Sequence, residues 1–235
     1  MRFRKKKVLV TDDNQGHITR ISSLLNKMGF STVPAESGHE AIKLSKIMSP
    51  DLILLDMNMP EMSGLEALKL LREDPRIAEV PVVMISSTLT IETAELCMSM
   101  GCFDHLIKPI DIDKLNVILQ KHLFKPHGQR RENLRVYFSG KVELTHSGHT
   151  EELYCKTLSE GGMYLKRKEP LPVGSEVHAR IFLDDKSHLD FDGAVIYNNP
   201  HQGVDMPQGM AIEFVAPRSE QIKALSDFIH KLLSE

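Results

Sequence analysis

Residues 51–60, DLILLDMNMP, decide the fold class of the first half of the chain. Four consecutive apolar residues, 52–55, end at an acidic one, Asp56. A short apolar run without alternation is typical of a strand buried on both faces, as in a parallel sheet covered by helices. Three more such runs occur, the last of them less apolar, at 8–10, 82–85 and 105–107.

Helical stretches separate these runs. Ile18, Ile21 and Leu25 recur at the helical period, and apolar residues within 65–71 and 112–123 do the same. A less hydrophobic strand is expected over 31–34. Five strands alternating with five helices predict a doubly wound α/β domain with right-handed crossovers. Ligands of such sheets bind at the carboxyl ends of the strands.

The second half follows a different pattern. After a short polar linker at 124–129, six short segments alternate between apolar and polar residues without helices between them. They lie at 135–144, 153–158, 163–166, 176–183, 189–197 and 210–215. This pattern predicts an antiparallel barrel or sandwich, and one amphipathic helix follows it. We therefore expect two domains, 1–125 and 126–235.

The composition excludes several classes of protein. The 235 residues are 41% hydrophobic and 26% charged, with a net charge of −3, which argues against a generally basic nucleic-acid or membrane-surface binder. Three cysteines, an odd number without metal-ligand spacing, fit a reducing compartment. No apolar run approaches the roughly 20 residues of a membrane span. The sequence predicts a soluble, cytoplasmic protein without membrane insertion.

Polar residues follow the predicted strands of the first half. Carboxylates, a hydroxyl and an ammonium group stand at the carboxyl ends of four strands: Asp12, Asp13, Asp56, Ser86 and Lys108. Because these ends meet at one edge of a parallel sheet, we expect the groups to share a shallow pocket. Clustered carboxylate oxygens favour magnesium. With a lysine beside one exposed carboxylate, this is a site for receiving a phosphoryl group, with Asp56 as nucleophile.

The segments VTDDN, DLILLDMNMP, VVMISS and IKPI resemble the receiver domain of two-component response regulators, over residues 5–125. The resemblance implies a flavodoxin-like fold and phosphorylation of Asp56 by a sensor histidine kinase or a phosphotransfer protein. It implies that Ser86 and Lys108 hold the phosphoryl group. It further implies four magnesium ligands: Asp12, Asp13, Asp56 and the backbone carbonyl of Asn58.

Two positions depart from the usual receiver pattern. The residue three before the lysine is often an aromatic that turns inward on activation, and here it is His105. With Ser86, His105 would form the switch, although an imidazole titrates near neutral pH. Ser87 stands where alanine is common. Five histidines show no spacing that would place them on the same face of an element as a carboxylate, so we expect no metal site at them: His17, His105, His122, His127 and His178.

Arginines and glycines form a second pattern in the other half. Arg130 and Arg131 precede Arg135, and a Thr-Leu-Ser-Glu-Gly-Gly segment at 157–162 follows at the end of the next predicted strand. Guanidinium groups can bind phosphate oxygens or the O6/N7 edge of guanine, and can stack on a base. A serine beside a glycine pair offers a hydroxyl and open N–H groups.

Arg131-x-x-x-Arg135, LSEGGMYL and GMAIEF at 209–214 resemble a PilZ domain, over residues 128–235. The resemblance implies a six-stranded barrel with a C-terminal helix and, in many members, binding of cyclic di-GMP. Its usual motif is RxxxR followed by (D/N)xSxxG. Ser159 and Gly162 match that motif, whereas Thr157 replaces its Asp or Asn and removes a polar partner. Weakened and lost nucleotide binding both stay open.

These patterns predict a response regulator, and no conventional enzyme, that acts on protein partners in motility, adhesion or biofilm control. Its nucleotide contacts would come from Arg130, Arg131, Arg135, Thr157, Ser159 and Gly162. The first alternative is a phosphorylation-controlled adaptor whose degenerate PilZ domain binds protein and no nucleotide. The second is a transcriptional regulator, which ranks lower because the second half has no helix-turn-helix pattern and no basic excess.

Overall fold

The structure is a computed structural model, and it describes residues 5–88, 90–123, 133–184, 186–201 and 207–234. These residues form two compact units, one drawn mainly from 5–123 and the other mainly from 133–234. The predicted linker at 124–129 lies outside the described residues. Among the described helices, none is both long and apolar enough to cross a membrane.

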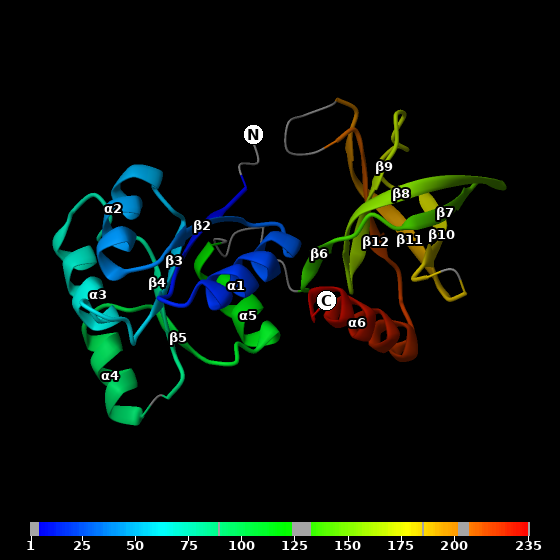
Figure 1. Cartoon of the computed structure of the whole chain (residues 1–235). Helices are drawn as coiled ribbons and strands as arrows, with labels where there is room; N and C mark the ends of the chain where they lie inside the picture. Colours follow the sequence, from blue (N-terminus) through cyan, green and yellow to red (C-terminus); the bar gives the residue numbers. More distant parts are fainter. Residues whose placement is uncertain (1–4, 89, 124–132, 185, 202–206, 235) are drawn as a thin grey trace. The chain divides into compact units, whose positions relative to one another are not determined.

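The first unit is a five-stranded parallel sheet with the strand order β2-β1-β3-β4-β5. The strands are β1 (Lys7–Thr11), β2 (Ser31–Ala35), β3 (Leu52–Asp56), β4 (Val82–Ser86) and β5 (Asp104–Ile107). The helices between and after them are α1 (Gln15–Lys27), α2 (Gly38–Met48), α3 (Gly64–Glu73), α4 (Ile91–Ser99) and α5 (Ile112–Leu123). The predicted alternation and the flavodoxin-like fold are confirmed (Figure 1).

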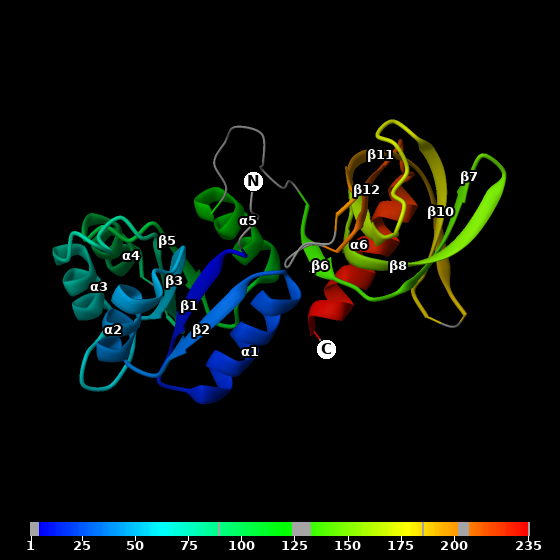
Figure 2. The ribbon, with the colours of Figure 1, turned by 90° about the horizontal axis from the view of Figure 1, so that it is seen from above.

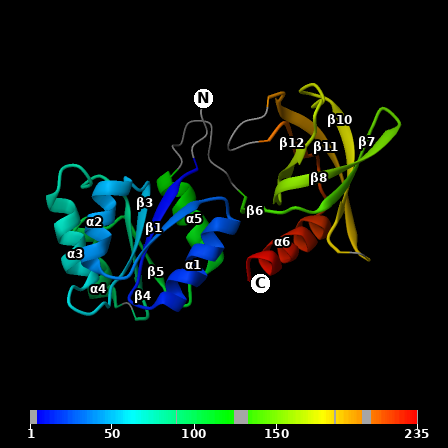
Figure 3. The same cartoon turned by 45° about the horizontal axis from the view of Figure 1, so that its top comes forward.

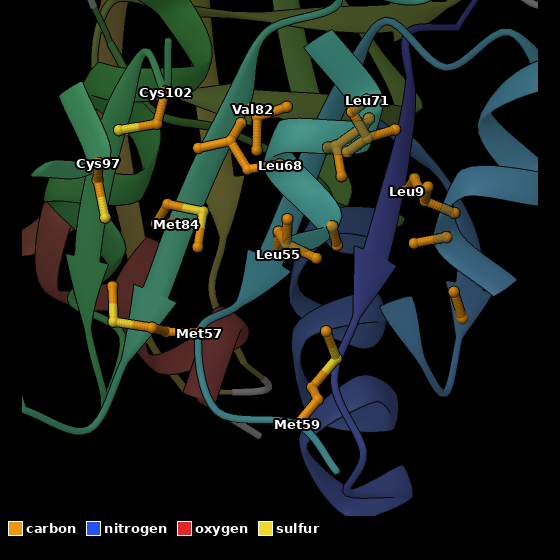
Figure 4. Packing of buried hydrophobic residues seen from close by; sticks show 14 of the residues in the cluster. Leu9, Leu55, Met57, Met59, Leu68, Leu71, Val82, Met84, Cys97 and Cys102 are labelled. Atoms are coloured by element: carbon orange, nitrogen blue, oxygen red, sulfur yellow. The ribbon is translucent and has the colours of Figure 1, made fainter. Parts of the chain in front are cut away.

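Helices cover both faces of this sheet. In two views, α1 and α5 lie on one side and α2, α3 and α4 on the other (Figures 2 and 3). Alternate strand residues such as Leu9, Leu55 and Met84 pack with α3 residues Leu68 and Leu71 in one hydrophobic cluster (Figure 4). All residues of β3 and β4 are buried, which explains why their sequences are continuous apolar runs.

The second unit is an antiparallel barrel followed by one helix. Its elements are β6 (Arg135–Tyr137), β7 (Lys141–His146), β8 (His149–Ser159), β9 (Gly162–Lys166), β10 (Glu176–Phe182), β11 (His188–Asn199), β12 (Gly209–Phe214) and α6 (Ser219–Ser234). The pairings β8–β7, β7–β10, β10–β11, β11–β12, β12–β9 and β9–β8 close a ring of six strands. The predicted six-stranded barrel with a C-terminal helix is therefore confirmed.

The prediction of one strand over 135–144 is wrong. This stretch forms β6 and β7, separated by 138–140, and β6 pairs with β8 beside the ring. The long strand β8 pairs with β7 along its first part, with β9 from Tyr154 onward, and with β6 along its last three residues. Glycine within a strand pattern often marks a bend, and Gly140 lies in the gap between β6 and β7. A Cβ at this position would clash with the Phe138 ring.

The barrel interior is apolar. The rings of Phe191 and Phe214 stack with centroids 4.2 Å apart, and Cys155 is fully buried. Leu225, Ile229 and Leu233 form the buried face of α6, which packs on β6 and β8. Phe228 of α6 meets Phe138 edge to face, with centroids 5.3 Å apart.

Candidate functional site

The carboxyl ends of four strands meet at one edge of the parallel sheet. Thr11 is level with Leu55, Asp56 with Ile85, and Ser86 with Ile107. Side chains that directly follow or end these strands are consequently neighbours, although they come from distant parts of the sequence. The structure brings together the groups that the strand pattern placed at this edge.

Three carboxylates form a compact cluster. One ligand oxygen each from Asp12, Asp13 and Asp56 lie within 4.8 Å of one another. Asp12 and Asp56 are buried, whereas Asp13 is exposed. The Asn58 backbone N–H donates to Asp56 Oδ1 at 3.4 Å. An all-oxygen donor set of this size fits a hard divalent cation such as Mg²⁺.

The Lys108 ammonium lies between two of these carboxylates. Its Nζ donates to Asp12 Oδ2 at 2.6 Å and to Asp56 Oδ2 at 2.7 Å. Burial lowers the pKa of Lys108, but the two carboxylate hydrogen bonds outweigh this effect and the pKa is raised. The lysine is therefore held as a cation beside Asp56.

The two buried carboxyls respond differently to this environment. Burial raises the pKa of Asp56, and the nearby Asp12 charge adds to this effect, so the Lys108 hydrogen bond does not bring the pKa back to its usual value. Burial also opposes ionisation of Asp12, but hydrogen bonds from Lys108 and the Asn14 N–H hold its pKa below the usual value. The pocket thus carries more negative charge than Lys108 alone offsets.

The two expected switch residues lie on neighbouring strands. Ser86 is buried at the end of β4, where its hydroxyl donates to the Thr88 carbonyl and accepts from the Thr88 N–H at 3.2 Å. His105 is half-buried on β5 and is level with Met84. Ser87 is exposed. In this arrangement the Ser86 hydroxyl is engaged with the loop that follows β4.

His17 lies beside the carboxylate cluster. The sequence pattern did not predict this position of His17. Its Nδ1 is 3.2 Å from each oxygen of Asp12 and 3.3 Å from Lys108 Nζ. The lack of a shared-face spacing in the sequence therefore did not exclude contact between His17 and a carboxylate. The same holds for His178, whose Nδ1 lies 2.8 Å from Asp192 Oδ1, and for His122, whose Nε2 lies 3.5 Å from Asp104 Oδ2.

The described residues of the second motif share one face of the barrel sheet. Arg135 is level with Ser159, and Thr157 lies two residues before Ser159 on β8, so the alternation of the strand places them on the same side. Ser159 is buried, and its hydroxyl donates to the Gly162 carbonyl at 3.0 Å. Arg130 and Arg131 lie outside the described residues.

Gly162 has a steric role at this position. An added Cβ would lie 2.2 Å from the Ile212 carbonyl oxygen on β12, far inside van der Waals contact. A Cβ on Gly161 would lie 2.5 Å from Asn133 Nδ2. The glycine pair therefore lets the β8–β9 turn lie directly against its neighbours.

Two family models match the chain in succession. The response regulator receiver domain matches residues 8–120, and the PilZ domain matches residues 129–231. These ranges correspond to the parallel-sheet unit and the barrel unit.

Known proteins that are similar to this chain include two curated response regulators and one solved structure. The Polar-differentiation response regulator DivK of Brucella ovis is 30% identical over 118 residues, which cover 50% of this chain and 96% of DivK. The Regulatory protein AtoC of Escherichia coli (strain K12) is 36% identical over 117 residues, 50% of this chain but only 25% of AtoC. A solved putative response regulator from Chloroflexus aurantiacus has 23% identity, a TM-score of 0.50, and coverage of 52% of this chain and 100% of its own. This last similarity concerns the fold alone.

Proposed function

Because the chain belongs to the response regulators, with a receiver domain joined to a PilZ domain, we propose that it is a phosphorylation-controlled signalling protein that binds cyclic di-GMP. The observation that carries the first half of this proposal is the contact between Asp56 Oδ2 and Lys108 Nζ, 2.7 Å long, within a cluster of three carboxylates. A sensor histidine kinase or a phosphotransfer protein would supply the phosphoryl group, and the protein would act in the cytoplasm.

In the proposed transfer, an Asp56 carboxylate oxygen attacks the phosphorus atom of the donor. The new O–P bond forms as the bond from phosphorus to the donor's leaving atom breaks, and Asp56 becomes an acyl phosphate. Lys108 offsets charge on the transferred oxygens. Ser86 would leave the Thr88 carbonyl and donate to a phosphoryl oxygen, while His105 would respond on the adjacent strand.

The carboxylates fit a divalent cation, which would supply positive charge against the three carboxylates and the phosphoryl oxygens. Asp12, Asp13, Asp56 and the Asn58 carbonyl would hold it. Apart from self-phosphorylation and hydrolysis of the acyl phosphate, we propose no enzymatic activity. The output would be contact with another protein, for example in motility, adhesion or biofilm control.

The test of the receiver uses acetyl phosphate and Mg²⁺, with intact-mass spectrometry to detect the added phosphoryl group. The wild type should gain one group, Asp56→Asn should gain none, and Asp13→Asn should gain little. The exposed Asp111, which caps α5 outside the pocket, offers a control as Asp111→Asn. Phosphorylation that persists in Asp56→Asn would contradict the assignment.

We propose that the cyclic di-GMP site includes Arg130, Arg131 and Arg135 with Thr157, Ser159 and Gly162. Its support is that Arg135, Thr157 and Ser159 share a sheet face and that the family motif begins with the arginines. Arginine forks can bind the phosphates and the guanine edges of this ligand. Thr157 offers one hydroxyl where the family motif has Asp or Asn, so the affinity should be lower than with a full motif.

The test is calorimetric titration with cyclic di-GMP. Arg135→Ala should weaken binding more than tenfold, since a charge-assisted contact contributes about 1.5–3 kcal/mol. Thr157→Asn should strengthen it. Arg218→Ala, which changes an exposed arginine that donates hydrogen bonds to Gln221, is the matched control. A wild type that does not bind at high micromolar ligand would favour the adaptor alternative, in which this domain binds protein only.

A further inference from the structure

The imidazole of His17 is a nitrogen donor placed against the carboxylate cluster. We propose that His17 is a ligand of the divalent cation at this site, and that it shifts the selectivity of the site toward transition-metal ions such as Mn²⁺ and Co²⁺ relative to Mg²⁺. This inference rests on the proposed receiver site and adds a residue that neither the sequence pattern nor the carboxylates alone assign.

Local hydrogen bonds fix the backbone of His17. Asn14 Oδ1 accepts from the N–H groups of Gly16 at 2.9 Å and His17 at 3.2 Å, and so caps the first turn of α1. The Asn14 N–H in turn donates to Asp12 Oδ1 at 2.9 Å. A Cβ on Gly16 would lie 3.0 Å from Asn14 Oδ1, so glycine keeps this cap uncrowded. The imidazole is thus tied to the same turn as Asp12.

The distances suit two donors on one ion. His17 Nδ1 is 3.2 Å from both oxygens of Asp12. Two neighbouring ligand atoms of an octahedral ion with bonds of about 2.1 Å are about 3.0 Å apart. The three carboxylates lie within 4.8 Å of one another without His17, and a movement of its ring toward them would let Asp12 and His17 bind the same ion. The His17 side chain is 46% exposed, which leaves it free to make that movement, while the Asp12 side chain is 1% exposed and fixed.

These donors already surround one positive atom. Lys108 Nζ lies 2.6 Å from Asp12 Oδ2, 2.7 Å from Asp56 Oδ2 and 3.3 Å from His17 Nδ1. A nitrogen and two oxygens, from the segment after β1 and from the end of β3, therefore converge on a cation in the structure. Within the cluster, the imidazole contacts the carboxylate of Asp12, so His17 and Asp12 are the two donors that would share the ion.

A nitrogen donor changes which ions the site prefers. Carboxylates and carbonyls suit Mg²⁺ and Mn²⁺, whereas imidazole suits the later first-row ions. Mg²⁺ gains little from exchanging a water ligand for an imidazole. The affinity for Co²⁺, and to a smaller degree for Mn²⁺, should therefore depend on His17, and the affinity for Mg²⁺ should not.

The direct test is pulsed electron paramagnetic resonance of Mn²⁺ bound to the full chain, produced without a polyhistidine tag. Nitrogen modulation from a coordinated imidazole should be present in the wild type, absent in His17→Gln, and unchanged in His39→Gln, which alters an exposed histidine of α2. Because the wild-type spectrum alone can contradict the proposal, the test does not depend on the folding of a variant.

The variant Asp13→Asn separates failure of this inference from failure of the proposed function. If Mn²⁺ binds in an Asp13-dependent manner but without nitrogen modulation, the receiver site stands and the role of His17 is overturned. If the modulation persists in His17→Gln, another histidine is the ligand and the role of His17 is again overturned. If Asp13→Asn leaves Mn²⁺ binding unchanged, the ion is not at the carboxylate cluster, which contradicts both proposals.

Calorimetric titrations supply a second readout. Co²⁺ should bind the wild type at least about tenfold more tightly than His17→Gln, because even outer-shell partners of metal ligands change the affinity by about 10–100-fold. The affinity for Mg²⁺ should change much less. Equal losses for both ions would contradict a ligand role and indicate that His17 only orients Asp12.

Discussion

Lys108 Nζ lies 2.7 Å from Asp56 Oδ2, and both side chains are largely buried, with exposures of 15% and 5%. An ion pair in such surroundings is screened little by water. The same ammonium also neutralises Asp12, so one positive group is shared by two buried carboxylates. This excess of negative charge has a cost in stability that can be measured.

Replacing Asp56 by Asn should stabilise the receiver domain in a cation-free buffer at neutral pH, by about 1 kcal/mol or about 4 °C in melting temperature. The pKa of Asp56 is raised by burial and by Asp12, so the ionised carboxylate is less favourable in the folded state than in the unfolded chain. This penalty is present above the folded pKa and disappears as the pH falls through it. Melting curves with a chelator at pH 7 and pH 4 measure the effect.

The stabilisation by Asp56→Asn should therefore be larger at pH 7 than at pH 4, and addition of Mg²⁺ should reduce it at pH 7. Glu95→Gln, on the exposed side of α4, should leave the melting temperature almost unchanged. A lower melting temperature for Asp56→Asn at pH 7 would show that the bond to Lys108 outweighs the repulsion.

Ser86→Ala should separate phosphorylation from its local response. The Ser86 hydroxyl binds both the carbonyl and the N–H of Thr88, so its movement toward a phosphoryl oxygen would release this loop. With beryllofluoride as a phosphoryl mimic, the Thr88 amide resonance should shift in the wild type and shift much less in Ser86→Ala. Beryllofluoride binding, followed at the resonances next to Asp56, should be retained. An equal Thr88 shift in both proteins would remove Ser86 from the switch.

Gly162→Ala should destabilise the barrel by about 1–3 kcal/mol, because its Cβ would overlap the Ile212 carbonyl and force β9 away from β12. Chemical denaturation followed by circular dichroism measures this loss. Gly148→Asn is the control, since this turn residue has open space around it and a φ of 77°, which Asn tolerates. A fully stable Gly162→Ala that has lost only nucleotide binding would show that this glycine serves the ligand and not the packing.

The thiols should be inert in the folded protein. Burial raises the pKa of Cys102 and of Cys155 to about 12, and that of Cys97 also lies above its usual value. At pH 8, alkylation of Cys102 and Cys155 by iodoacetamide should be roughly a thousandfold slower than that of a free thiol, because the thiolate is the nucleophile. Alkylation of Cys97 should also be slower than that of a free thiol. All three cysteines should react at the free rate in denaturant. Rapid labelling of a native cysteine, located by peptide mass spectrometry, would contradict its burial.

The strands of the receiver could be predicted because a strand that is buried on both faces consists of consecutive apolar residues, as at 52–55 and 82–85. The positions of Asp12, Asp56 and Lys108 then followed from the rule that ligands lie at the carboxyl ends of parallel strands. The break between β6 and β7 was missed because apolar alternation continues across it. The turn-forming residues Ser139 and Gly140 were the part of the sequence that could have indicated this break.

His17 could not be predicted, because its contact with Asp12 depends on the angle at which α1 leaves the turn after β1. No periodicity encodes that angle. The contact between His178 and Asp192 was missed for a related reason, since these residues meet only through the register of β10 and β11. Spacing along one chain segment predicts neighbours within an element, but not those between elements.

The separation of 96 residues between Asp12 and Lys108 also bears on synthesis at the ribosome. Residues emerge from the N-terminus first, so the carboxylates are made well before the only lysine that neutralises them within the described pocket. Until β5 joins the sheet edge, a nascent chain carries the phosphoryl-accepting group without its cation. A kinase that requires the assembled pocket would therefore not phosphorylate partly synthesised chains. Phosphorylation would be restricted to chains whose receiver domain is complete.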